Sequence, residues 1–221
     1  MSACDAMNST KTIKILAIDD HPLFRKGVSD LVSMDDSMTL VGEAANGPDG
    51  LRLATELNPD FILLDINMKG MSGLETLAAI KQADIEARVL MLTVSDNEED
   101  VIAALRSGAD GYLLKDMEPE DILLSLRQAA AGKVVISERL TQLLAHALRE
   151  DRRKGDANTA ANLTERERQI LALVSQGLSN RIIADRLEIS EGTVKVHVKH
   201  LLKKLELHSR VEAAVWALSN L

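Results

Sequence analysis

Two kinds of apolar pattern alternate through the first 130 residues. Short continuous apolar runs are typical of strands buried on both faces, and apolar positions spaced by three or four residues are typical of amphipathic helices. The predicted strands are 13–18, 39–45, 61–64, 88–92 and 111–114, and the predicted helices are 22–34, 50–57, 74–83, 98–107 and 119–131. This alternation predicts an α/β domain in which helices cover both faces of a doubly wound, five-stranded parallel sheet of the flavodoxin type.

From residue 163 onward only helical spacing remains. Thr164 and Glu167 have the spacing of a capping box, which predicts a helix start there, and Gly177 ends that helix. Serines in the N-cap position predict a second helix over 179–187 and a third over 190–205, and a fourth helix follows from residue 209. The second helix is expected to turn Ile182 and Ile183 inward. The C-terminal part is therefore predicted to be an all-α, four-helix domain.

The chain divides into four segments on this pattern. Residues 1–10 form a polar, flexible tail, 11–133 the α/β domain, 134–162 a linker that includes a helix within 137–153, and 163–221 the helical domain. No apolar run reaches the roughly 18–20 residues that cross a bilayer, so we expect no membrane insertion and a cytoplasmic location. The single cysteine, Cys4, excludes a disulfide within the chain.

Charge is distributed unevenly between the two halves. Residues 1–150 carry 14 basic and 25 acidic side chains, a net charge of −11, whereas residues 151–221 carry 12 basic and 9 acidic side chains, a net charge of +3. A polyanion such as DNA is therefore expected to meet only the second half. The four Phe, Tyr and Trp residues are too few for a surface that stacks single-stranded bases.

Polar residues stand at the carboxyl ends of four predicted strands. Asp19 and Asp20 follow the first strand, Asp65 the third, Thr93 the fourth and Lys115 the fifth. The carboxyl ends of parallel strands meet at one edge of a sheet, where ligands bind in open α/β folds. Any one of these residues alone is more simply explained as a helix cap or a solvated charge. Their joint placement predicts one site.

The composition of this predicted site points to phosphoryl chemistry. Three neighbouring carboxylates repel one another unless a cation compensates, and oxygen ligands suit Mg²⁺. Asp65 could then attack a phosphoryl group as a carboxylate nucleophile, while Lys115 neutralises charge and the Thr93 hydroxyl donates a hydrogen bond to a phosphoryl oxygen.

The third helix of the C-terminal domain has an apolar stripe and a basic face. Lys195, Lys199 and Lys203 recur every four residues, with Val196 beside them. This order of a short helix, a tight turn and a longer basic helix is typical of a helix-turn-helix motif. In that motif the later helix enters the major groove of double-stranded DNA. Lys195, Val196 and Lys199 are the candidates for reading bases. Lys203, Lys204 and Arg181 are candidates for phosphate contacts. A solvated helix face is the alternative reading of the lysine row.

The first half resembles the receiver domain of bacterial response regulators over residues 13–132. The resemblance rests on 19–22 (DDHP), 64–68 (LDINM), Thr93 and 108–115 (GADGYLLK). It implies Mg²⁺ bound by Asp20, Asp65 and the backbone carbonyl of Asn67, with Asp19 supporting. It also implies phosphoryl transfer from a sensor histidine kinase to Asp65, and switch roles for Thr93 and Tyr112. One residue departs from the pattern: Lys69 stands where this family usually has proline.

The second half resembles the four-helix DNA-binding domain of the LuxR/FixJ class over residues 163–221, on the stretches 163–167, 177–184 and 192–198. The resemblance implies a homodimer on paired half-sites, with the last helix as the dimer contact. The whole chain resembles the NarL/FixJ response regulators, in particular those that respond to nitrate and nitrite. In such relatives the unphosphorylated receiver covers the recognition helix, and the acidic first half here is consistent with that arrangement.

Three other functions fit parts of this pattern, and particular residues count against each of them. A Mg²⁺-dependent phosphatase with an aspartyl-phosphate intermediate carries a second acid two residues after its nucleophile, where this chain has Asn67. A flavin carrier needs a glycine- and hydroxyl-rich loop after the first strand, where this chain has acids. A receiver that acts only through protein partners leaves the lysine row unexplained. The sequence therefore favours a regulator over an enzyme.

Overall fold

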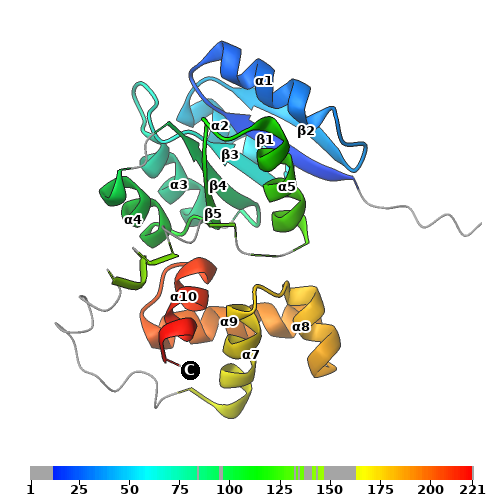
Figure 1. The fold of residues 1–221 in the computed structure, drawn as a ribbon, viewed down its shortest axis with the longest axis vertical. Helices are drawn as coiled ribbons and strands as arrows, with labels where there is room; N and C mark the ends of the chain where they lie inside the picture. The colour runs from blue at the N-terminus through cyan, green and yellow to red at the C-terminus, as the bar shows by residue number, and fades with distance from the viewer. Residues whose placement is uncertain are drawn as a thin grey trace, which may run out of the picture.

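A computed structural model describes residues 12–83, 85–94, 97–131, 133, 135–136, 141–142, 144–146 and 163–220. Its first domain is a parallel sheet in the strand order β2-β1-β3-β4-β5 (Figure 1). The strands are β1 (Ile13–Ile18), β2 (Met38–Ala44), β3 (Phe61–Leu64), β4 (Arg88–Thr93) and β5 (Gly111–Leu114). The helices between and after them are α1 (Pro22–Val32), α2 (Gly47–Leu57), α3 (Gly73–Gln82), α4 (Glu98–Arg106) and α5 (Pro119–Ala130). The predicted doubly wound fold is confirmed.

Helices cover both faces of this sheet because every strand is apolar on both sides. Leu16, Ile62 and Met91 face a cluster that includes residues of α2, α3 and α4. Ile15, Leu63 and other strand residues pack on the opposite face, in a cluster that contains residues of α1 and α5. Asp19, Asp65 and Thr93, at the carboxyl ends of their strands, belong to neither cluster.

The predicted elements of this domain agree with the structure to within two residues, except at the start of α2. That helix begins at Gly47, three residues earlier than predicted. The Asn46 side chain accepts a hydrogen bond from the backbone N–H of Asp49 and so caps the helix, with proline in its first turn. The first turn carries no large apolar residue, so periodicity alone missed it.

The second domain contains α7 (Glu165–Ser175), α8 (Asn180–Leu187), α9 (Glu191–Leu205) and α10 (Arg210–Asn220). All three predicted N-caps are confirmed, because the side chains of Thr164, Ser179 and Ser190 accept hydrogen bonds from backbone N–H groups in the first turns. Thr164 and Glu167 form both halves of the capping box. The expected burial of Ile182 is wrong: its side chain is exposed, while Ile183 is fully buried.

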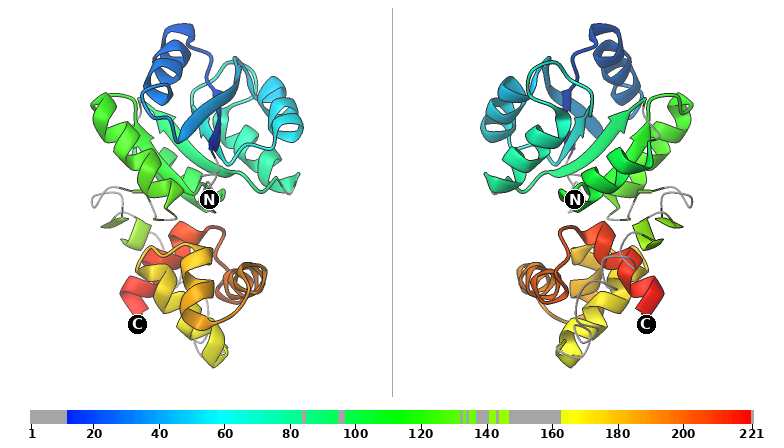
Figure 2. Two further views of the ribbon diagram at one scale, coloured as in Figure 1. Left: turned by 90° about the vertical axis from the view of Figure 1, so that its right-hand side faces the viewer. Right: turned by 90° about the vertical axis from the view of Figure 1, so that its left-hand side faces the viewer.

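The two domains are in contact, with the helical domain below the sheet in Figures 1 and 2. Helix α10 contacts α4. Val211 and Val215 of α10 are 0% and 2% exposed and belong to the same apolar cluster as Val101, Leu105 and Tyr112 of the first domain. One face of α10 is therefore buried by the first domain.

Most of the predicted linker helix within 137–153 lies outside the described residues, so that prediction and the exact domain bounds stay predictions. No helix in the described part of the chain has the length and apolar character needed to span a membrane.

Candidate functional site

Four strand ends deliver the predicted acidic site to one edge of the sheet. Asp19 directly follows β1 and is 4% exposed, and Asp65 directly follows β3 and is 2% exposed. Their places are fixed by the sheet itself, since the N–H of Asp65 donates to the carbonyl of Ile18 (3.0 Å) and the N–H of Asp19 to that of Ala44 (3.0 Å). The structure therefore brings the predicted carboxylates together, as expected.

Lys115 neutralises part of this charge. Its Nζ lies 2.6 Å from Asp19 Oδ2 and 3.0 Å from Asp65 Oδ2, and all three side chains are less than 8% exposed. The same Nζ lies 4.5 Å from the centre of the Phe24 ring, a cation–π distance. The N–H of Lys115 donates to the carbonyl of Thr93 (2.8 Å), which ties the ends of β4 and β5 together. Lys115 is thus held between two carboxylates rather than in solvent.

Charge at the site is still unbalanced, because three carboxylates face one ammonium group. Burial raises the pKa of Asp65 above its ordinary value of 3.8, and Asp19 adds to this effect, whereas the ion pair with Lys115 opposes it. Asp65 Oδ1 and Asp20 Oδ1 are buried, and neither accepts a hydrogen bond of normal geometry from a described residue. Buried carboxylate oxygens without a donor are costly and fit a bound cation.

His21 is a further member of the cluster, beyond the predicted site residues. Its Nδ1 lies 3.1 Å from Asp19 Oδ1, 3.0 Å from Asp20 Oδ1 and 3.8 Å from Asp65 Oδ2. Ligand atoms of His21 and the three aspartates lie within 4.8 Å of one another. Its place directly after Asp20 in the sequence was the available signal.

The two predicted switch residues are both buried. Thr93 is fully buried at the end of β4, and Tyr112 on β5 is 3% exposed, in the apolar cluster that reaches α10.

The loop after β3 is held by a backbone hydrogen bond, because the N–H of Gly73 donates to the carbonyl of Ile66 (2.9 Å). A Cβ on Gly73 would stand 2.0 Å from the carbonyl oxygen of Asp65, so glycine is required there.

The basic face of α9 is exposed, as the helix-turn-helix hypothesis requires. The residues predicted to contact DNA are all exposed: Lys195, Val196, Lys199, Lys203 and Arg181. Val194, Leu201 and Leu205 on the opposite side are buried in the core of the helical domain. Lys204 is also exposed, and its Nζ donates to Glu167 Oε2 (2.7 Å), which joins α9 to α7. Its phosphate contact stays a prediction.

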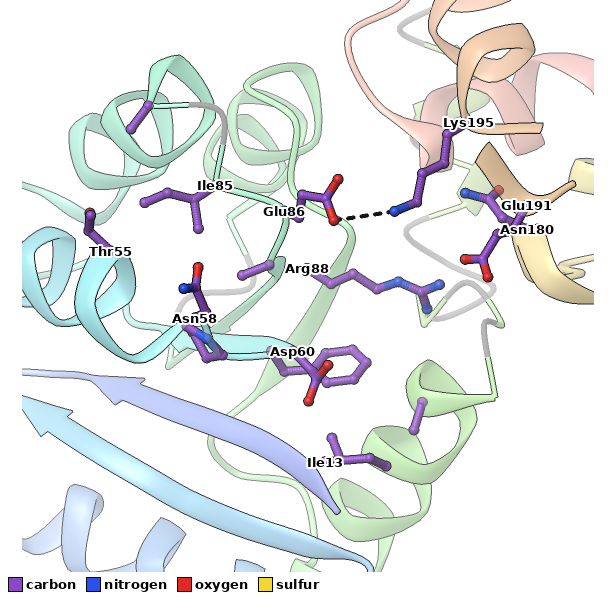
Figure 3. A pocket seen from close by; sticks show the side chains of 15 residues that line it. Ile13, Thr55, Asn58, Asp60, Ile85, Glu86, Arg88, Asn180, Glu191 and Lys195 are labelled. Atoms are coloured by element: carbon purple, nitrogen blue, oxygen red, sulfur yellow. Dashed lines mark hydrogen bonds and ion pairs between the residues drawn. The ribbon is translucent and has the colours of Figure 1, made fainter. Parts of the chain in front are cut away.

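The start of α9 faces the first domain. Lys195 Nζ lies 3.3 Å from Oε2 of Glu86, which precedes β4, and Figure 3 shows the two side chains pointing toward one another. A cleft of about 880 Å³ surrounds this pair and is lined by both domains, with Glu191 and Asn180 on one side and Asp60 and Arg88 on the other. No pattern in the sequence singles out Glu86.

Comparison with known protein families assigns each half of the chain to a family. The family of the response regulator receiver domain matches residues 15–127, and the luxR family of bacterial regulatory proteins matches residues 161–217.

Individual relatives match almost the whole chain. The nitrate/nitrite response regulator protein NarL of Escherichia coli is 56% identical over 210 residues, which cover 95% of this chain and 97% of that protein. NarP of the same organism, also a nitrate/nitrite response regulator, is 46% identical over 95% of this chain and 96% of its own. Among solved structures, the response regulator ChrA of a heme-sensing two-component system is 33% identical, covers 95% of this chain and 98% of its own, and has a TM-score of 0.51. The receiver domain of a response regulator from Mycobacterium tuberculosis is 37% identical over 56% of this chain and 99% of its own, with a TM-score of 0.54.

Proposed function

The chain belongs to the family of response regulators that join a receiver domain to a LuxR-type DNA-binding domain, and we propose that Asp65 is the residue through which phosphorylation controls it. The chain is a transcription regulator of a two-component system, and its receiver domain implies a sensor histidine kinase as partner. Asp65 is the most deeply buried carboxylate of the acidic cluster, at 2% exposed, and it pairs with Lys115.

The acceptor chemistry follows from the positions of these side chains. A carboxylate oxygen of Asp65 attacks the phosphorus of a phosphohistidine, the P–N bond breaks, and an aspartyl phosphate forms. Lys115, 3.0 Å from Asp65, compensates charge on the transferred group. Thr93 at the end of β4 offers its hydroxyl to a phosphoryl oxygen. Asn67, two residues after Asp65, offers no general acid or base for rapid turnover, which favours a regulator over a phosphatase.

The residues present fit Mg²⁺. Asp20 Oδ1 and Asp65 Oδ1 are buried without a hydrogen-bond donor among the described residues, and the cluster consists mainly of oxygen ligands. We propose Asp20, Asp65 and the backbone carbonyl of Asn67 as ligands, with Asp19 in support. Mg²⁺ bound there supplies positive charge that lets the carboxylates and a phosphoryl group approach one another.

Control of DNA binding is proposed to work by steric exclusion, because the receiver domain stands beside the start of the recognition helix although the lysine side chains remain exposed to solvent. The observation that carries this proposal is the pair Lys195–Glu86, which places a candidate base-reading lysine 3.3 Å from the receiver domain. A recognition helix must enter a groove roughly 12 Å wide and 8.5 Å deep. A helix whose reading face touches another domain cannot do so. DNA binding therefore requires the two domains to separate.

The dimer contact is proposed to be covered in the same way. The family resemblance assigns the homodimer contact to the last helix, and one face of α10 is buried against the receiver here. Separation would free α9 for double-stranded DNA and α10 for a second copy of the chain. A regulator of bacterial promoters works in the cytoplasm, where we place it. The names of the relatives with 56% and 46% identity support nitrate or nitrite as the signal.

Acetyl phosphate with Mg²⁺, followed by a DNA mobility shift, tests the proposal. Wild-type protein should carry phosphate and bind promoter DNA more tightly, and Asp65→Asn should do neither. Phosphorylation of Asp65→Asn to the wild-type extent would refute the site. If a fragment of residues 155–221 bound DNA no more tightly than the unphosphorylated full chain, the covering of α9 would be refuted. The sites bound in the genome would identify the regulated genes and test the nitrate assignment.

A further inference from the structure

The loop after β3 holds a lysine whose backbone reaches the acidic site. The N–H of Lys69 donates to Asp20 Oδ2 at 3.3 Å and so joins this loop to the one after β1. Proline, which the family usually has at this position, has no N–H and cannot make this bond. The contact is therefore a property of this chain's own sequence.

The bond occupies one oxygen of Asp20, Oδ2. The other oxygen, Oδ1, is buried and lies 3.0 Å from His21 Nδ1, but it accepts no hydrogen bond of normal geometry within the described part of the chain. The Asp20 side chain as a whole is 17% exposed, so it has some freedom to turn. A donor on Oδ2 restricts that freedom and keeps Oδ1 directed to the site.

We propose that Lys69 is a positioning residue, whose backbone N–H holds Asp20 in the orientation that binds the divalent cation. The inference rests on the proposed Mg²⁺ site. Groups that hydrogen-bond to a metal ligand orient it, and their loss typically lowers metal affinity by roughly 10- to 100-fold. The bond here is 3.3 Å long and near the surface, so we expect the low end, about tenfold.

The lysine side chain has the opposite effect on a cation, which allows the two contributions to be separated. The Lys69 side chain is exposed and has no ion pair among the described residues. Its positive charge repels Mg²⁺ weakly, so removal of that charge alone should leave affinity unchanged or slightly raise it. Lys69→Gln removes the charge and keeps the N–H, whereas Lys69→Pro removes both.

Calorimetric titration of Mg²⁺ into the unphosphorylated full chain tests the inference without relying on phosphoryl transfer. Lys69→Pro should bind Mg²⁺ about tenfold more weakly than wild type. Lys69→Gln should bind within about twofold of wild type or more tightly. In an Asp20→Asn background, Lys69→Pro should have no further effect, because the N–H acts through that carboxylate. Unfolding curves without metal should be alike for Lys69→Pro and Lys69→Gln.

Each contrary outcome has a distinct meaning. Equal Mg²⁺ affinity of Lys69→Pro and Lys69→Gln would overturn the role of the N–H while leaving the proposed site intact. If Lys69→Pro lowered Mg²⁺ affinity equally in the Asp20→Asn background, the Lys69 N–H would not act through the Asp20 carboxylate. If wild-type protein bound no Mg²⁺, or if Asp20→Asn bound it as wild type does, the proposed metal site would be wrong and the inference with it.

Discussion

The pair between Lys195 and Glu86 yields a prediction with a bounded magnitude. The Glu86 side chain is 83% exposed and that of Lys195 49%, so the pair lies in solvent. Exposed ion pairs contribute about 0.2–1 kcal/mol. If DNA binding requires the domains to separate, Glu86→Ala should strengthen DNA binding by the unphosphorylated protein by at most about fivefold. Glu86→Lys adds repulsion of similar size and should strengthen it by up to about 30-fold.

A charge change on an acidic receiver also alters its general attraction to DNA, so the assay needs a matched control. Glu120, an exposed acid in the first turn of α5, is absent from the lining of the cleft. Glu120→Lys changes the net charge by the same amount. Fluorescence anisotropy with promoter DNA would give the affinities of both variants, with and without acetyl phosphate. The DNA affinity of Glu86→Lys should exceed that of Glu120→Lys only in the unphosphorylated state. This difference in affinity should shrink as the salt concentration increases.

Two results would refute this reasoning. Equal effects of Glu86→Lys and Glu120→Lys would show that the pair does not oppose DNA binding. An effect of Glu86→Lys that persists undiminished after phosphorylation would show that the pair is not broken by the switch.

Two further predictions concern the receiver alone. Lys115→Met leaves the buried carboxylates of Asp19 and Asp65 without their ammonium partner, so urea unfolding without metal should show a loss of about 3–5 kcal/mol, part of which Mg²⁺ restores; an unchanged midpoint would contradict the pairing. Hydrogen bonds from Ser37 and from Arg127 (2.7 Å) lower the pKa of Asp35 from 3.8 to about 2, so the stability they provide is complete above pH 3.8 and disappears as the pH falls toward 2. Asp35→Asn should therefore be less stable than wild type at pH 7, with a gap that closes between pH 4 and 2, and a gap independent of pH would be the contrary result.

Local sequence signals predicted the elements and most of the site, because strand ends and helix caps are determined by neighbouring residues. Asp19, Asp65 and Lys115 could be brought together on topology alone, since parallel strands end at a common edge. The first turn of α2 was missed because its signal is a cap at Asn46 and not an apolar repeat. The ion pair of Lys204 was not predicted, because its spacing on α9 does not reveal its partner Glu167 on α7.

Contacts between the domains could not be predicted in the same way. Val211 and Val215 have the spacing of ordinary core residues, and nothing in the sequence distinguishes burial within a domain from burial against another one. Glu86 is an isolated acid before a strand, and its partner lies 109 positions later in the chain. Such pairs depend on how two finished domains pack, which periodicity does not encode.

The shared apolar cluster offers a physical route from Asp65 to the DNA-binding domain. The proposed phosphorylation of Asp65 adds a group with a charge near −2 at the end of β3, which pairs with β4, the strand that ends at Thr93. Tyr112 lies on β5, which pairs with β4, and it packs in the same cluster as Val101 and Leu105 of α4 and Val211 of α10. Close-packed interiors repack between discrete arrangements and do not deform continuously. A shift of Tyr112 or α4 toward the phosphate would therefore change the apolar surface against which α10 packs. The weak ion pair between Lys195 and Glu86 alone would not hold the two domains together.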